Sequence, residues 1–204
     1  MDRRDFLKTV AITGAALSIQ HSEAMEILTQ TINNTNGGNP DLVAVMGGEP
    51  EAMFRRAISE LGGMKQFVKP GQKVVVKPNI GWDKVPELAG NTNPQLTAEI
   101  VKQCFAAGAK EVTVFDHTCD DWQKCYKNSG IEAAAKAAGA KVMPAHLESY
   151  YKPVNLPNGQ KMKKAKIHEA ILNCDVWINV PILKNHGGAN LTISMKNHMG
   201  IVWD

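Results

Sequence analysis

The chain has 204 residues, of which 44% are hydrophobic, and a net charge of +3 at pH 7. This is enough for one domain with a real hydrophobic core. The small positive surplus, with no run of Lys and Arg interleaved with aromatic residues, argues against nucleic-acid binding. The sequence also lacks a P-loop, a Gly-x-Gly-x-x-Gly and a Gly-x-Ser-x-Gly, so nucleotide binding and serine-hydrolase chemistry have no support.

The N-terminus has the pattern of an export signal. Arg3 and Arg4 precede Phe6 and Leu7, and residues 9–20 then carry no charge. An arginine pair before such an apolar run is typical of the twin-arginine translocation (Tat) pathway. The run is shorter than the roughly 20 apolar residues that cross a bilayer. We expect export by the Tat machinery, with residues 1–24 either cleaved from a periplasmic protein or kept as an N-terminal membrane anchor, and no span elsewhere.

The rest of the chain alternates predicted strands and helices. Residues 25–40 are polar and rich in Asn and Gly, which indicates a linker before a domain at 41–204. Within that domain we expect strands at 42–46, 73–77, 111–115, 141–143 and 176–180, helices at 50–61, 94–107, 129–138 and 168–173, and a hairpin within 144–166. This order predicts an α/β fold, with a mainly parallel sheet and helices on both faces.

A short internal repeat supports this alternation. The sequence Ala-Ala-Gly-Ala-Lys occurs at 106–110 and again at 137–141, 31 positions later. Each copy lies where a predicted helix ends and a predicted strand begins. The spacing is close to one strand-and-helix unit, so the repeat is interpreted as one geometry used twice.

Polar residues follow the ends of three predicted strands. In open α/β sheets, ligands bind beyond the carboxyl ends of the strands, so these residues are expected to meet at one edge. As general acids or bases we predict His117, His186 and Lys184. As substrate-binding residues we predict Lys77, Asn79, Asp116, Asn185, Lys196 and Asn197.

The richest segment is 180–200, which contains Lys-Asn-His twice, at 184–186 and 196–198. Two cations, two imidazoles and two amides suit an anion or a metal better than a core. The pair Gly187-Gly188 would let backbone amides approach an anion. The sequence does not assign residues 189–199 to one element; if they are helical, Thr192, Met195 and Lys196 share one face. We expect Lys196 to point toward the same pocket, and the alternative is a helix whose Lys-Asn-His end is exposed to solvent.

The four cysteines suggest a second hypothesis. No Cys-x-x-Cys is present, so the spacing supports neither a zinc ribbon nor a ferredoxin-type cluster. Cys104 and Cys174 lie in apolar surroundings and are expected in the core. Cys119 and Cys125 flank a polar loop, and three alternatives stay open for them. They form a disulfide, they bind a metal ion or iron–sulfur cluster together with His117, or they are two unpaired thiols.

Three functions therefore stay open. The first is an exported enzyme acting on an anionic small molecule through Lys and His groups. The second is a metal- or iron–sulfur-binding redox protein that uses Cys119, Cys125 and His117. The third is a solute-binding domain without chemistry.

Five motifs resemble the DUF362 family, a domain family of unknown function. They are the sequences at 76–82 (Val-Lys-Pro-Asn-Ile-Gly-Trp), 92–94, 107–114, 181–186 and 195–200. The resemblance implies an exported member of that family, because several members begin with a Tat signal. Similar proteins continue past the position of Trp203, so the fold and site are expected to be incomplete at Asp204. Members described as iron–sulfur proteins carry a cysteine cluster that this chain lacks.

Overall fold

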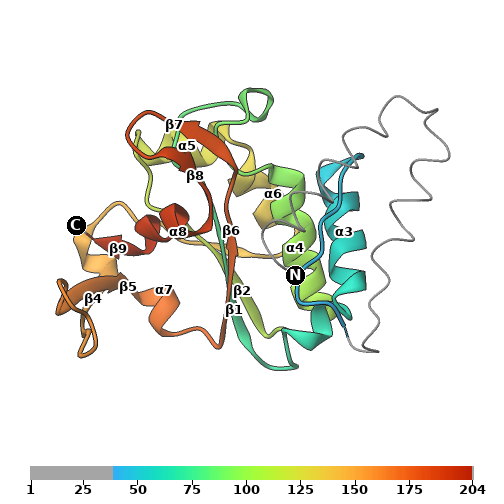
Figure 1. The fold of residues 1–204 in the computed structure, drawn as a ribbon, viewed down its shortest axis with the longest axis horizontal. Coiled ribbons are helices and arrows are strands. Elements are labelled where there is room, and N and C mark those ends of the chain that lie inside the picture. The colour runs from blue at the N-terminus through green and yellow to red at the C-terminus, as the bar shows by residue number, and fades with distance from the viewer. Residues whose placement is uncertain (1–38, 204) are drawn as a thin grey trace, which may run out of the picture. The chain divides into compact units, whose positions relative to one another are not determined.

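Four parallel strands form the central sheet of this computed structural model, which describes residues 39–203 (Figure 1). Their order is β3 (Lys141–Val142), β2 (Glu111–Val114), β1 (Lys73–Pro78) and β6 (Val176–Val180). The chain moves outward from β1 to β2 and β3, and then returns to place β6 on the other side of β1. The strand order therefore reverses between β1 and β6, which is where open α/β sheets bind their ligands.

One face of the sheet is covered by helices. These are α3 (Pro50–Glu60), α4 (Pro94–Ala106), α5 (Trp122–Asn128) and α6 (Ile131–Ala137). The side chains of Val74, Val76 and Val114 point into this core, together with Ile100 of α4 and Ile131 of α6. Because side chains alternate along a strand, the intervening Val75 points to the opposite face.

The second face carries shorter helices and a small antiparallel sheet, on the other side of the central strands in Figure 1. The sheet has the order β4 (Tyr151–Asn155), β5 (Lys164–His168) and β9 (Val202–Trp203). The helical elements are α7 (Glu169–Leu172), α8 (Ser194–Asn197) and the 3-10 turn η5 (His198–Ile201). A second core of Val75, Phe115, Tyr151, Ala170 and Ile201 lies between these elements and the sheet.

The remaining elements are short. A hairpin of β7 (Lys184–His186) and β8 (Asn190–Thr192) follows β6 and lies at the top of Figure 1. Three further 3-10 turns are η2 (Met64–Gln66), η3 (Pro86–Leu88) and η4 (Glu148–Tyr150). Among the described residues, no helix is long and apolar enough to cross a membrane.

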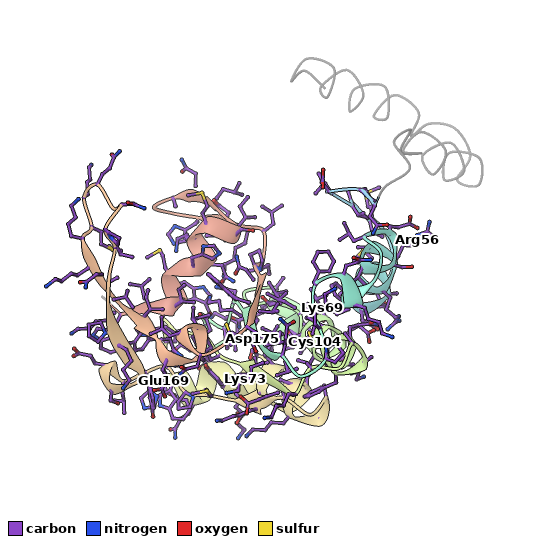
Figure 2. All side chains as sticks on the ribbon, turned by 90° about the horizontal axis from the view of Figure 1, so that it is seen from below. Arg56, Lys69, Lys73, Cys104, Glu169 and Asp175 are labelled. Atoms are coloured by element: carbon purple, nitrogen blue, oxygen red, sulfur yellow. The ribbon has the colours of Figure 1, made fainter. Side chains whose placement is uncertain are left out.

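Two hydrogen bonds join the N-terminal ends of β1 and β6, at the end of the strands away from the β7–β8 hairpin. The backbone N–H of Lys73 donates to Asp175 Oδ2 at 2.7 Å, and the N–H of Asp175 donates to the carbonyl of Lys73 at 2.9 Å. Figure 2 labels both residues, where β1 and β6 begin. This reciprocal pair sets the register in which Lys77 lies opposite Asn179 at the carboxyl ends of the strands.

The α/β fold with a parallel sheet is confirmed, and most predicted elements are present. Asn93 caps α4 as expected, because its Oδ1 accepts from the N–H groups of Gln95 and Leu96 at 2.8 and 3.1 Å. The predicted hairpin within 144–166 is the pair β4 and β5. The predicted signal at 1–24 lies outside the described residues, as does the predicted linker except for its last two positions.

One predicted strand is absent, and two further segments differ in detail from the sequence-based expectation. Residues 42–46 form no strand, and Leu42 and Met46 are 82% and 81% exposed, because no strand of the described chain pairs with them. The helix predicted at 129–138 is present as α6, but the preceding helix α5 was not predicted. The two helices are separated at Gly130, whose φ of 72° lies in the left-handed region. Residues 189–199 are not one helix, because β8 pairs with β7 before α8 begins.

Candidate functional site

The centre of the candidate site is a buried ion pair between two neighbouring strands. Lys77, near the end of β1, and Asp116, just after β2, are 1% and 2% exposed, and their Nζ and Oδ1 atoms lie 2.6 Å apart. Burial lowers the pKa of Lys77 and raises the pKa of Asp116, and each charge opposes the shift of the other. The two charges therefore offset each other inside the protein.

Asn197 of α8 connects this ion pair to β6. Its Oδ1 accepts from Lys77 Nζ at 2.9 Å, and its Nδ2 donates to the Lys77 carbonyl at 3.2 Å and to Asn179 Oδ1 at 2.8 Å. The same Oδ1 accepts from Asn79 Nδ2 at 3.3 Å. Asn197 is thus fully hydrogen-bonded and 5% exposed, so it positions other groups rather than presenting a free amide.

Gly200 packs directly against the ion pair. A Cβ atom at this position would lie 2.8 Å from Lys77 Nζ and closer still to Asp116 Oδ1, which is a hard overlap. Only glycine permits this approach of the η5 backbone. The glycine of the Met-Gly sequence at 199–200 therefore has a packing role that the sequence did not reveal.

The carboxylate of Asp116 is held from several sides. Its Oδ2 accepts from the N–H of Ile80 at 2.7 Å. The hydroxyl of the buried Tyr126 accepts from the N–H of Asp116 at 2.8 Å and approaches the carbonyls of Asp116 and Met143. Burial raises the pKa of this phenol, so it stays protonated. These bonds fix the backbone at the end of β2.

Lys184 approaches from the opposite side of the site. Its Nζ donates to Asn79 Oδ1 at 2.9 Å and to the carbonyl of Gly90, and it lies 5.8 Å from the centroid of the Trp82 ring. Within residues 39–203 no carboxylate lies within 4.0 Å of it. Burial lowers its pKa, and the nearby charge of Lys196 lowers it further.

These groups surround a cavity of about 240 Å³ at the carboxyl ends of β1 and β6. Nine predicted site residues line it: Lys77, Asn79, Asp116, His117, Cys119, Lys184, His186, Lys196 and Asn197. Asn185 does not line it, since its side chain lies exposed on the β7–β8 hairpin beside a neighbouring cavity. Cys125 is absent from the wall too, because it is buried beneath Gly81.

The two histidines of the cavity differ in their surroundings. His117 is half-buried and stacks on Trp203, with ring centroids 5.2 Å apart and planes within 8°. Burial lowers its pKa, against the opposing charge of Asp116, so it is neutral at pH 7. His186 accepts from the N–H groups of Gly188 and Ala189 through Nδ1, at 3.1 and 3.0 Å. A neutral His186 therefore carries its proton on Nε2.

These hydrogen bonds change one expectation. The sequence predicted that the Gly187-Gly188 pair offers its amides to an anion. The N–H of Gly188 instead donates to His186, so it orients the imidazole.

The two cysteines assigned to a metal both lie near Gly81 but differ in exposure. Cys119 and Cys125 are free thiols, and Cys119 is exposed whereas Cys125 is buried. Burial raises the pKa of both thiols, that of Cys125 to about 11, so both are protonated at pH 7 without a metal. Across residues 39–203, no three His, Cys, Asp or Glu side chains are placed to hold a metal ion. Among these described residues, Cys119, Cys125 and His117 therefore do not form a three-residue group of metal-binding side chains.

Several contributors had not been predicted. Asn179, Trp82 and Trp203 touch the site, but each lies in a segment that the sequence marks only as a strand, a loop or the chain end. Asn179 had one available signal, because a lone amide in the apolar run 176–180 is unusual for a buried strand.

Comparison with known proteins gives three findings. The family described as Domain of unknown function (DUF362) matches residues 74–204. A Synechocystis sp. protein named thylakoid-associated protein is 26% identical over 151 residues, covering 74% of this chain and 46% of that protein. The structure of the lactate racemase apoprotein from Thermoanaerobacterium thermosaccharolyticum superposes with a TM-score of 0.48 at 14% identity, over 76% of this chain and 37% of that one. The chain spans less than half of both relatives.

Proposed function

Because the chain belongs to the DUF362 family, whose function is unknown, we propose its function from the site: it binds or transforms an anionic small molecule at the carboxyl ends of β1 and β6. The observation that carries the proposal is the charge around the cavity. Three lysines and one aspartate line it, a surplus of two positive charges. A carboxylate or phosphate group would neutralise that surplus.

Lys184 and Lys196 are the proposed anion-binding groups. The charge of Lys77 is already offset by Asp116, whereas Lys184 and Lys196 have no carboxylate within 4.0 Å among the described residues. An ammonium has three donors, and two of those on Lys184 are used by Asn79 and Gly90. The third donor of Lys184 is free for a ligand oxygen.

His117 and His186 are the proposed proton-transfer groups. A neutral imidazole accepts a proton as a general base, and the lowered pKa of His117 keeps it neutral at pH 7. His186 offers its Nε2–H as a donor, since its Nδ1 is occupied by backbone amides. His117 would thus serve as the general base and His186 as the hydrogen-bond donor in one anion-binding cavity.

Ligand titration tests this proposal. Acetate, phosphate and sulfate are titrated into the protein while tryptophan fluorescence is recorded, because Trp82 lines the cavity. Lys184→Gln and Lys196→Gln should each weaken binding about tenfold, the loss expected for one charged hydrogen bond. Lys163→Gln is the matched control, because Lys163 is exposed on the β4–β5 hairpin. The proposal fails if none of the anions binds, or if the control weakens binding as much.

We also propose that the protein is exported by the Tat machinery through residues 1–24. The support is the pair Arg3 and Arg4 before the uncharged run at 9–20. Replacing both arginines by lysine keeps the charge and should retain the protein in the cytoplasm, as fractionation would show. Export of this double variant at the level of the unchanged protein would refute the proposal.

A further inference from the structure

A second cavity adjoins the first, on its outer side. It measures about 400 Å³, and Trp82, Lys184 and His186 line both cavities. The remaining wall includes Leu88 and the side chain of Lys84, both contributed by the loop between β1 and α4. The two cavities are thus neighbours that share three lining side chains, and Lys184 is one of them.

The outer cavity has an apolar wall that faces solvent. Trp82 is 37% exposed and Leu88 is 64% exposed. Burying apolar surface is favourable by roughly 25 cal/mol per Å², so an unoccupied wall of this kind favours an apolar ligand group. Trp82 also offers a flat aromatic face for stacking.

The loop that carries this wall is held in place. Asn91 Oδ1 accepts from the N–H of Trp82 at 3.0 Å, and Asn91 Nδ2 donates to the carbonyls of Trp82 and Lys84 at 2.8 and 3.3 Å. Asp120 Oδ2 accepts from the N–H of Asp83 at 3.0 Å. A backbone fixed in this way presents the exposed Trp82 without a large cost in conformational entropy on binding.

From the adjacency of the two cavities at Lys184 we infer the class of ligand: an amphiphilic anion, with an acidic group in the inner cavity joined to an apolar or aromatic group that lies against Trp82 and Leu88. The inference rests on the proposed function, because the acidic group is held by the same Lys184. Small inorganic anions would fill the inner cavity alone. A ligand with an apolar group uses both cavities at once.

A chain-length series tests the inference. Acetate, butyrate, hexanoate and octanoate, kept below their micelle concentrations, are titrated with tryptophan fluorescence as the readout. Full burial of one methylene is worth about a fourfold gain in affinity, and a half-open wall about twofold. We therefore expect affinity to rise about two- to fourfold for each added methylene. Lys184→Gln should weaken every member by a similar factor, because it removes the charge contact common to all.

Leu88→Ser isolates the apolar contribution. It should reduce the gain per methylene and leave acetate binding unchanged, because Leu88 lines only the outer cavity. Leu172→Ser is the matched control, since Leu172 is a 45% exposed leucine of α7 that lines neither cavity. Equal affinity for acetate and octanoate would overturn the inference and leave the proposed function standing, as would an unchanged gain in Leu88→Ser. Failure of acetate, phosphate and octanoate alike to bind would instead refute the proposed function.

Discussion

Replacing Gly200 by alanine should destabilise the protein through the ion pair beneath it. The added Cβ would overlap Asp116 Oδ1 and lie 2.8 Å from Lys77 Nζ and 2.9 Å from Lys77 Cε. If η5 moves away, the cost is that of overpacking, about 1–3 kcal/mol. If Asp116 turns away from Lys77 instead, a buried ion pair is broken, at about 3–5 kcal/mol. We therefore expect a loss between about 1 and 5 kcal/mol.

Urea unfolding measures this loss as a change in the free energy of unfolding. Gly187→Ala is the matched control, because a Cβ at Gly187 would have no heavy atom within 4 Å. Its effect should stay within about 0.5 kcal/mol, as for an ordinary surface substitution. Since domains are stable by only about 5–15 kcal/mol, the Gly200→Ala protein should still fold.

A Gly200→Ala protein as stable as Gly187→Ala would refute the reasoning. Such a result would mean that η5 can separate from the ion pair without cost. If stability is lost as expected, the binding assay distinguishes the two ways in which the overlap can be relieved. A shift of η5 leaves Lys77 and Asp116 paired, whereas a rotation of Asp116 releases an uncompensated lysine charge beside the cavity.

Three more predictions follow from buried groups. Lys77→Met should lower the free energy of unfolding by about 3–5 kcal/mol, because it leaves the buried Asp116 unpaired. The double variant Lys77→Met/Asp116→Leu should recover most of that loss in urea unfolding. A double variant as unstable as the sum of the two single variants would contradict this. His168 caps α7 through Nδ1, and burial lowers its pKa in the folded protein. The unfolded chain therefore binds a proton at His168 near pH 6.5, whereas the folded protein binds it only at lower pH. Stability should therefore fall as pH drops below about 6.5, and His168→Asn should flatten that fall in thermal unfolding at several pH values; an unchanged slope would contradict it. In thiol labelling at pH 8, the exposed Cys119 should react well before the buried Cys125, whose pKa is raised to about 11, and the reverse order would contradict the fold.

The sequence predicted the sheet and the meeting of polar residues at its carboxyl end because both depend on local patterns. The apolar run at 73–77, the Asn-Pro start of α4 and the polar residues after the strands are all readable along the chain. The prediction of a strand at 42–46 was wrong because a strand depends on a distant partner. An apolar run needs a neighbouring strand to pair with, and the described chain supplies none for these residues. The local sequence pattern of a segment does not show which other strand, if any, it pairs with.

The roles inside the site also depended on distant contacts. Asp116 and Asn197 were predicted to bind substrate, but both are occupied by Lys77, which is 39 and 120 positions away along the chain. Likewise Asn185 is next to Lys184, yet the alternation of β7 directs it away from the inner cavity. Side-chain types identified the region, whereas the division into positioning and binding groups required the fold.

The long separation of Lys77 and Asn197 has a consequence for biosynthesis. Their bond joins residues 120 positions apart, and Gly200 is added later still. At a synthesis rate of about 5–20 residues per second, Asn197 follows Lys77 by roughly 6–24 s. During that interval the nascent sheet carries a lysine and an aspartate without the segment that covers them. The segment 194–203 therefore covers this ion pair only after both strands that carry it have been made.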